Sequence, residues 1–212
     1  MKYLITGASS GIGESIARQA AAEKYDLILV ARRGEKLEEI KNDLEISEGI
    51  NVETIAADLT VKKDIEKVVS RLQENDVDVL INNAGFGSSG PFSELDIDNE
   101  LNEIDLNIRA LVQLAHAAAR SMVDKNSGTI VNISSMASYQ PMVGNATYGA
   151  SKAFVTSFSH AISEELRPAG VDVLLVCPGM TETAFFDRSS WFDADKNKGG
   201  YPKFLWKNSE QV

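Results

Sequence analysis

The stretch KYLITGASSGIG, residues 2–13, decides the fold. It begins with a short apolar run of strand length, and the residues after the turn have helical spacing. Three glycines shape the turn: Gly7 permits a tight bend, Gly11 lets a pyrophosphate approach the backbone, and Gly13 allows the helix to pack closely on the strand. A plain glycine turn is the structural alternative. The strand before it and the helix after it favour a nucleotide-binding loop.

Outward from this stretch, apolar runs of strand length alternate with helix-length segments. The strands read as nearly continuous apolar runs, as expected for a parallel sheet that is covered on both faces. The alternation predicts an α/β, doubly wound Rossmann fold with six strands in a mostly parallel sheet. The predicted strands are 2–6, 26–31, 51–58, 77–85, 128–135 and 171–179, and the predicted helices are 10–23, 35–47, 62–75, about 98–125 and about 147–167.

Length and composition set the outer limits. The chain has 212 residues, enough for one substantial domain, and we expect a single Rossmann-fold domain over 1–212. Its net charge of −10 makes it a poor candidate for binding nucleic acid or an anionic membrane. One cysteine excludes an internal disulfide, and neither a signal peptide nor an apolar run of about 20 residues is evident, so a cytoplasmic location is expected. No Cys/His/Asp cluster has metal-ligand spacing, and no metal is predicted.

The end of the second predicted strand indicates which cofactor binds. NAD-selective sites carry an acid there, whereas a 2′-phosphate calls for arginine. This strand ends in VARRGEK, which places Arg32 and Arg33 at that position without an acid. Two solvated surface arginines are the alternative, but beside the glycine turn they favour NADP over NAD.

The stretch YGASK, residues 148–152, carries the candidate chemistry. Tyr148 and Lys152 are four residues apart, and on a helix this spacing stacks them on one face. A lysine cation favours the phenolate and lowers the pKa of the tyrosine, which has an ordinary value of about 10. Alone, the pair is also ordinary for an amphipathic helix.

The motifs together resemble the short-chain dehydrogenase/reductase family. TGASSGIG (6–13), NNAG (82–85), the strand end ISS (133–135), YGASK (148–152) and PGMTET (178–183) occur in the order and at the spacings of that family. The resemblance covers about residues 1–185. It implies an NAD(P)-dependent oxidoreductase that transfers a hydride between nicotinamide and a small-molecule carbonyl or alcohol substrate. A non-catalytic NADP-binding sensor or scaffold is the rival hypothesis.

The resemblance assigns four catalytic positions. Tyr148 matches the acid/base, and Lys152 its pKa-lowering, ribose-binding partner. Ser135 matches the serine that holds the substrate oxygen, and Asn107 the asparagine that anchors a proton-relay water. Ser134 is the competing serine, but adjacent strand residues point to opposite faces and the spacing favours Ser135.

The resemblance also implies the cofactor contacts. Thr181 departs slightly from the family, in which an aliphatic residue is commoner at that position, but a backbone contact would survive the change. The expected contacts are Gly7, Ser9, Ser10, Gly11, Ile12, Gly13, Arg32, Arg33, Asp58, Leu59, Asn83, Ala84, Gly85, Tyr148, Lys152, Pro178, Gly179, Thr181 and Thr183.

The C-terminal part has no clear period. We expect 184–206 to form a substrate lid. The C-terminus after it is short for the family, whose members usually have a further helix and a seventh strand there. The family pairs its subunits partly through two long helices. Segments 99–123 and 148–166 contain more apolar positions than one core-facing stripe needs, which predicts a homodimer through these segments.

Overall fold

The computed structural model describes residues 1–179, 181–182 and 207–209. In this part of the chain, six parallel strands form one sheet in the order β3-β2-β1-β4-β5-β6, which confirms the predicted α/β doubly wound fold. The strands are β1 (Lys2–Thr6), β2 (Asp26–Ala31), β3 (Val52–Ala56), β4 (Val79–Asn82), β5 (Gly128–Ile133) and β6 (Val171–Val176).

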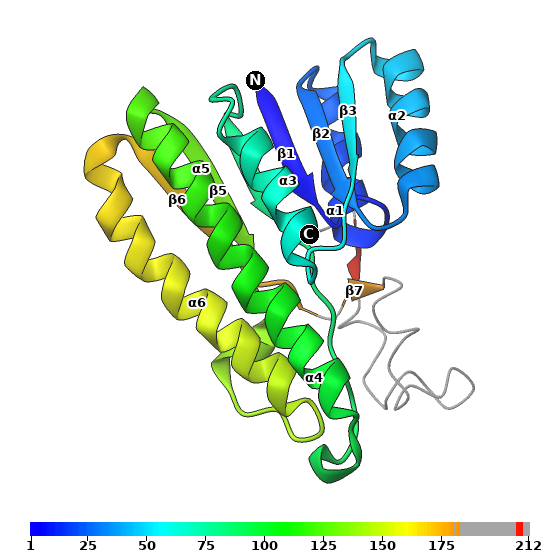
Figure 1. Ribbon diagram of the computed structural model, residues 1–212, viewed down its shortest axis with the longest axis vertical. Helices are drawn as coiled ribbons and strands as arrows, with labels where there is room; N and C mark the ends of the chain where they lie inside the picture. The colour runs from blue at the N-terminus through cyan, green and yellow to red at the C-terminus, as the bar shows by residue number, and fades with distance from the viewer. Residues whose placement is uncertain (180, 183–206, 210–212) are drawn as a thin grey trace.

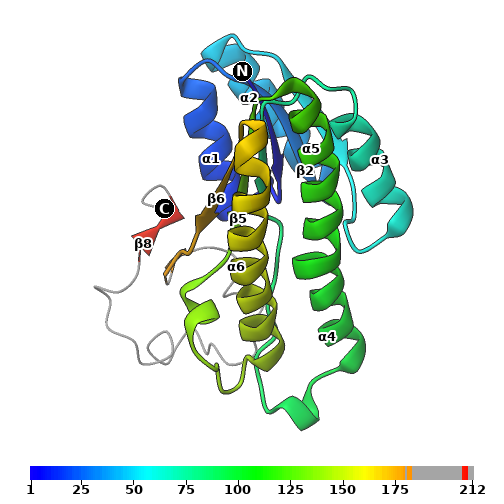
Figure 2. The ribbon, with the colours of Figure 1, turned by 90° about the vertical axis from the view of Figure 1, so that its left-hand side faces the viewer.

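Helices cover both faces of the sheet, and the views in Figures 1 and 2 show the layers. One face packs on α3, α5 and the last turns of α6, through Leu4, Ile28 and Ile130 of the strands. The other face packs on α1 and α2 through Ile5, Leu27 and Leu29. The helices are α1 (Gly11–Ala22), α2 (Gly34–Glu48), α3 (Lys62–Leu72), α4 (Ile97–Ile104), α5 (Leu111–Lys125) and α6 (Ala146–Leu166).

The strand order reverses beside β1. This strand pairs with β2 on one side and with β4 on the other, where Tyr3 lies opposite Val79. The chain therefore leaves β1 and β4 toward opposite directions at their carboxyl ends. In an open α/β sheet this divergence creates the crevice in which ligands bind.

The strands before the predicted motifs end earlier than the sequence patterns indicated. β4 stops at Asn82, β5 at Ile133 and β6 at Val176. The residues that follow, including Asn83, Ser135 and Pro178, therefore belong to loops at the carboxyl edge of the sheet.

The helical stretch predicted over about 98–125 runs without a gap from Ile97 to Lys125, but it is not α-helical throughout. A π-helical turn, η2 (Asp105–Ala110), separates α4 from α5. The extra residue in such a turn rotates the side chains that follow, and these turns are frequent at functional sites. Asn107 lies within it and is fully buried.

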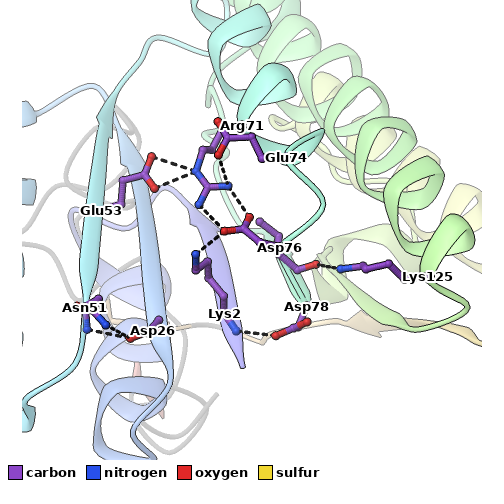
Figure 3. A network of polar contacts seen from close by, with 10 residues as sticks. Lys2, Asp26, Asn51, Glu53, Arg71, Glu74, Asp76, Asp78 and Lys125 are labelled. Carbon is purple, nitrogen blue, oxygen red and sulfur yellow. Dashed lines mark hydrogen bonds and ion pairs between the residues drawn. The ribbon is translucent and has the colours of Figure 1, made fainter.

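The amino edge of the sheet, opposite the loops, carries a network of ion pairs (Figure 3). Arg71 of α3 donates to Glu53 from Nε at 2.9 Å and to Asp76 from Nη1 at 2.6 Å, and its Nη1 lies 3.3 Å from a Glu74 oxygen. Lys2 binds Asp76 through its ammonium group. We call Lys2, Glu53, Arg71, Glu74 and Asp76 the amino-edge network.

The C-terminal part of the chain is described at two short strands. β7 (Thr181–Glu182) pairs in parallel with β8 (Lys207–Asn208). The predicted lid, 184–206, and the predicted contact Thr183 lie outside the described residues.

Candidate active site

The turn after β1 has the conformation that its glycines were expected to provide. Gly7 and Gly11 have φ angles of +68° and +59°, in the left-handed region that favours glycine. A Cβ on Gly13 would lie 2.5 Å from the carbonyl oxygen of Gly7 and 2.5 Å from Nδ2 of Asn83. The turn, α1 and the loop after β4 thus pack too closely for any other residue at this position. Such a turn at a helix N-terminus fits a pyrophosphate.

A cleft of about 650 Å³ runs along the carboxyl edge of the sheet from this turn. Its volume lies in the range of small-molecule and cofactor sites. Most predicted contacts line it: Gly7, Ser9, Ser10, Gly11, Ile12, Arg32, Arg33, Asp58, Leu59, Asn83, Ala84, Gly85, Ser135, Tyr148, Lys152, Pro178, Gly179 and Thr181. Gly13 and Asn107 do not line the cleft but lie behind its wall.

Two arginines lie at the end of the cleft beside β2. Arg33 folds back on the glycine turn, where its Nη2 donates to the carbonyl oxygen of Ser9 at 2.9 Å. Arg32 is more than half exposed, and within the described part of the chain its nearest carboxylate oxygen, on Asp58, is 3.8 Å away. Arg32 is therefore only loosely held and presents a guanidinium that fits a phosphate.

Asn83 fixes the loop after β4 against the glycine turn. Its Nδ2 donates to the carbonyl oxygen of Thr6 at 2.9 Å, and the Thr6 hydroxyl accepts from the backbone N–H groups of Asn83 and Ala84. Asp58 is held differently, since its Oδ1 accepts from the backbone and hydroxyl of Thr60. These bonds shape the wall that would flank an adenosine.

The other end of the cleft holds the Tyr148–Lys152 pair on α6. The Nζ of Lys152 lies 5.8 Å from the centroid of the Tyr148 ring and donates to the carbonyl oxygen of Ile133 at 2.9 Å. The lysine is almost fully buried. Burial lowers its pKa from 10.5 to about 8, against the opposing effect of Glu103.

The pKa of Tyr148 corrects one expectation. Burial raises it above 10, and the charge of Glu103 raises it further, while a hydrogen bond with Ser135 lowers it. The lysine alone thus does not turn the tyrosine into a stronger acid. An oxidised nicotinamide is cationic, and its charge would favour the phenolate when the cofactor is bound.

The two adjacent serines have separate surroundings. Ser134 also borders the cleft but is buried, and its hydroxyl is engaged by α6: it donates to the carbonyl oxygen of Lys152 at 2.9 Å and lies 2.8 Å from the Thr156 hydroxyl. Ser135 faces the cleft, and its Oγ accepts from the backbone N–H of Ala137 at 3.1 Å. Ser135 stays the predicted substrate contact, because its hydroxyl also hydrogen-bonds with Tyr148.

Asn107 joins three segments behind the site. Its Nδ2 donates to the carbonyl oxygen of Phe86 at 2.9 Å and to the hydroxyl of Ser151 at 3.0 Å. Its Oδ1 accepts from the backbone N–H of Phe86 at 3.2 Å. The side chain therefore locks the loop after β4 to the helix that carries Tyr148.

The sequence patterns missed one wall of the cleft. The segment between Ser135 and Tyr148 contributes a mixed apolar and polar surface, including the mostly exposed Met136 and Tyr139. The position of this segment between two recognised motifs was the available signal. The unpredicted lining residues there are Met136, Ala137, Tyr139, Gln140, Met142 and Asn145.

The described residues contain no group of three or more His, Cys, Asp or Glu side chains that could hold a metal ion. Across the same residues, no helix combines the length and apolar character that crossing a membrane requires.

Comparison with known proteins supplies the family. Residues 2–192 match the family of short chain dehydrogenases. Sulfoacetaldehyde reductase 2 of Chromohalobacter salexigens is 39% identical over 86% of this chain and 73% of its own length. The NADP-dependent 3-hydroxy acid dehydrogenase of Salmonella typhi is 36% identical over 94% of this chain and 80% of its own.

Solved structures give the same result. A short-chain dehydrogenase from Sphingobium yanoikuyae in complex with NADPH superimposes with a TM-score of 0.91 and 37% identity, over 99% of this chain and 80% of that one. Nothing in these comparisons supports the non-catalytic alternative. The chain belongs to the short-chain dehydrogenase family and is an oxidoreductase that uses a nicotinamide cofactor.

Proposed function

We propose that this oxidoreductase uses NADPH in preference to NADH and transfers a hydride between nicotinamide and a small carbonyl or alcohol substrate. One observation carries the proposal. A single cleft joins the glycine turn, with Arg32 and Arg33 beside it, to Ser135, Tyr148 and Lys152 at its other end. The names of the relatives that bind or depend on NADP support the cofactor.

The roles of the chain's own groups follow from their chemistry. When bound, the reduced cofactor supplies the hydride. The Tyr148 hydroxyl donates a proton to the oxygen on which negative charge develops, and the Ser135 hydroxyl donates a hydrogen bond to the same oxygen. Both side chains line the same end of the cleft.

Lys152 and Asn107 support this pair. The buried ammonium of Lys152 lies close to the Tyr148 ring and supplies a positive field for the phenolate that proton transfer leaves. Asn107 holds the loop after β4 and α6 in a fixed relation through its three hydrogen bonds. We propose it as the anchor of the proton relay on that ground and on the family resemblance.

Turnover tests the proposal. NADPH consumption is measured against a panel that includes sulfoacetaldehyde, 3-oxo acids and simple ketones, and NADP reduction against serine and 3-hydroxy acids. Tyr148→Phe should lower kcat by about 10²- to 10⁴-fold, because a positioned acid contributes about that factor. Its affinity for NADPH should stay near the native value. Near-native turnover in this variant would refute the role of Tyr148.

We also propose a homodimer. Ile97, Leu101 and Ile104 of α4 and Phe154 of α6 are large apolar side chains with exposed fractions of 39–60%. Burying this patch against its copy around a two-fold axis would remove it from water. Light scattering should give the mass of two chains, and a monomer would contradict the proposal.

Three further predictions remain proposals. A single domain over 1–212 with a substrate lid at 184–206 is supported by the sequence pattern. The absence of nucleic-acid binding is supported by the net charge of −10. A cytoplasmic location is supported by the single cysteine. Fluorescent tagging in the native host and DNA titration would test the last two.

A further inference from the structure

α4 presents two buried carboxylic acids to the wall behind the candidate site. Glu100 and Glu103 are three residues apart, which places them on one face of the helix, and they are 3% and 0% exposed. Each has one oxygen with a donor. Glu103 Oε2 accepts from the backbone N–H of Ser88 at 2.8 Å, and Glu100 Oε2 accepts from the Thr147 hydroxyl.

Among the residues that the structure describes, the other oxygen of each acid has no hydrogen-bond partner. Glu103 Oε1 and Glu100 Oε1 are both buried and unpaired. An ionised carboxylate in this position loses its hydration without full compensation. The charge of Glu100 further disfavours the ionised form of Glu103 and raises its pKa.

Glu103 lies close to the groups assigned to the chemistry. It precedes Asn107 by one helical turn, and the two side chains hold adjacent parts of one loop, at Ser88 and at Phe86. At Gly85, in the same loop, an added Cβ would lie 2.9 Å from Asn107 Oδ1 and 3.5 Å from Lys152 Nζ. The lysine is thus close to η2, the turn that directly follows α4.

The electrostatics agree with this placement. Burial raises the pKa of Glu103 to about 7, the charge of Glu100 raises it as well, and hydrogen bonds from Ser88 and the charge of Lys152 lower it. In turn, Glu103 raises the pKa of both Lys152 and Tyr148. Lys152 and Tyr148 are therefore the titrating groups to which Glu103 is coupled, and Glu100 is the neighbouring acid on its own helix.

We propose that Glu103 is a positioning residue for the Tyr148–Lys152 pair: a buried carboxyl group on α4, bonded to the loop that also lies beside Lys152, whose ionisation holds the lysine as an ammonium and extends the reaction toward higher pH. The inference rests on the proposed roles of Tyr148 and Lys152. The group touches neither substrate nor cofactor and acts through α6. When Glu103 is protonated it exerts no such effect, so the pH range of the reaction depends on whether Glu103 is ionised.

Glu103→Gln separates charge from shape. The amide oxygen of glutamine can still accept from Ser88, so the loop stays attached while the charge is removed. Without the carboxylate, the pKa values of Lys152 and Tyr148 both fall. In carbonyl reduction with NADPH, the alkaline limb of the kcat profile should therefore move to lower pH by roughly half to one pH unit.

The shape of the difference identifies the cause. Native Glu103 is itself neutral at low pH, so the native and Gln profiles should converge below about pH 7, where its pKa lies, and separate above it. Asp98→Asn on the exposed side of the same helix is the matched control. It removes an equal charge and should leave the profile unchanged. A purely structural role would lower kcat at every pH.

A second measurement uses the native chain and needs no substrate. With ¹³C-labelled lysine, the Cε resonance of Lys152, assigned through a Lys152→Arg chain, should show an extra inflection near pH 7 as Glu103 titrates. Matching native and Glu103→Gln profiles, or no inflection, would overturn the inference. A failure of the proposed function would give another result: Tyr148→Phe would then keep its turnover.

Discussion

The pKa shifts favour charged side chains at the amino edge of the sheet and neutral side chains at the carboxyl edge. In the amino-edge network, Arg71 faces three carboxylates, and these pairs hold the pKa of Asp76 well below its usual range and that of Arg71 above its own. At the carboxyl edge, burial shifts Tyr148, Lys152 and Glu103 toward their neutral forms. Paired charges stabilise a fold, whereas Lys152 and Glu103, with pKa values of about 8 and about 7, can exchange protons near neutral pH. One sheet thus keeps its stabilising ions apart from its reactive groups.

The largest effect should come from Lys152→Met. We expect kcat to fall by at least about 100-fold, since the field that favours the phenolate is lost. The free energy of unfolding at pH 7 should stay the same or increase by up to about 3 kcal/mol. In the native chain, keeping Lys152 charged in a buried place costs free energy, as its lowered pKa shows, and methionine removes that cost. Kinetic assays and urea unfolding measure the two effects.

Lys125→Met is the control at the other edge. Lys125 Nζ also donates to a backbone carbonyl oxygen, that of Val77, at 2.8 Å. This variant should keep its turnover. Equal losses of activity in the two lysine variants would remove the distinction between the edges.

Arg71→Met should show the reverse pattern. The Arg71 side chain is 9% exposed, and its loss leaves Glu53 and Asp76 without their main partner. Because those carboxylates are 45% and 40% exposed and recover some hydration, we expect a loss of about 2 kcal/mol in unfolding free energy. Turnover at 25 °C should remain native. The exposed pair of Arg167 and Glu164 gives the control, since Arg167→Met should change stability by less than about 0.5 kcal/mol.

The pH dependence of stability should differ in sign between the edges. The folded-state pKa of Asp76 is lowered, so its contribution is present above the unfolded value and is lost as pH falls through the folded one. Asp76→Asn should flatten acid unfolding. The pKa of Glu103 rises from an ordinary value of 4.5 to about 7 in the folded chain. Between those pH values the unfolded chain loses this proton and the folded chain keeps it, so the free energy of unfolding falls as pH increases. Relative to the native chain, Glu103→Gln should gain stability over that range. Parallel curves for both variants would contradict the comparison.

The smallest effect on stability is expected for Arg32, which is not held in a close ion pair in the described part of the chain. The Arg32 side chain is 59% exposed and lies 3.8 Å from the carboxylate of Asp58. Arg32→Asp should leave stability within about 0.5 kcal/mol of native. Its preference for NADPH over NADH should fall by roughly tenfold or more, since a phosphate would meet a carboxylate. Fluorescence titration with both cofactors measures this, and an unchanged ratio would remove Arg32 from the phosphate site.

The fold and the cleft were predictable because local patterns specify them. Alternating strand and helix periods located all six strands of the main sheet, and the glycines at 7, 11 and 13 fall where the turn requires them. The π-helical turn at Asn107 was not predictable, because its apolar residues keep a helical period on both sides. Nor was the burial of Glu103, since an acid in a charged helix ordinarily faces water.

The position of β1 has a consequence for how the molecule is made. This strand comes before the other strands in the sequence but lies in the middle of the sheet. One of its two neighbours is β4, so Tyr3 can pair with Val79 only after β4 has been synthesised. During synthesis, the β3-β2-β1 half can assemble from consecutive segments, but one side of β1 stays open until β4 emerges from the ribosome. Such a long closure is entropically costly and slows folding. An apolar strand edge of β1 therefore stays uncovered until β4 has been synthesised and can pair with it.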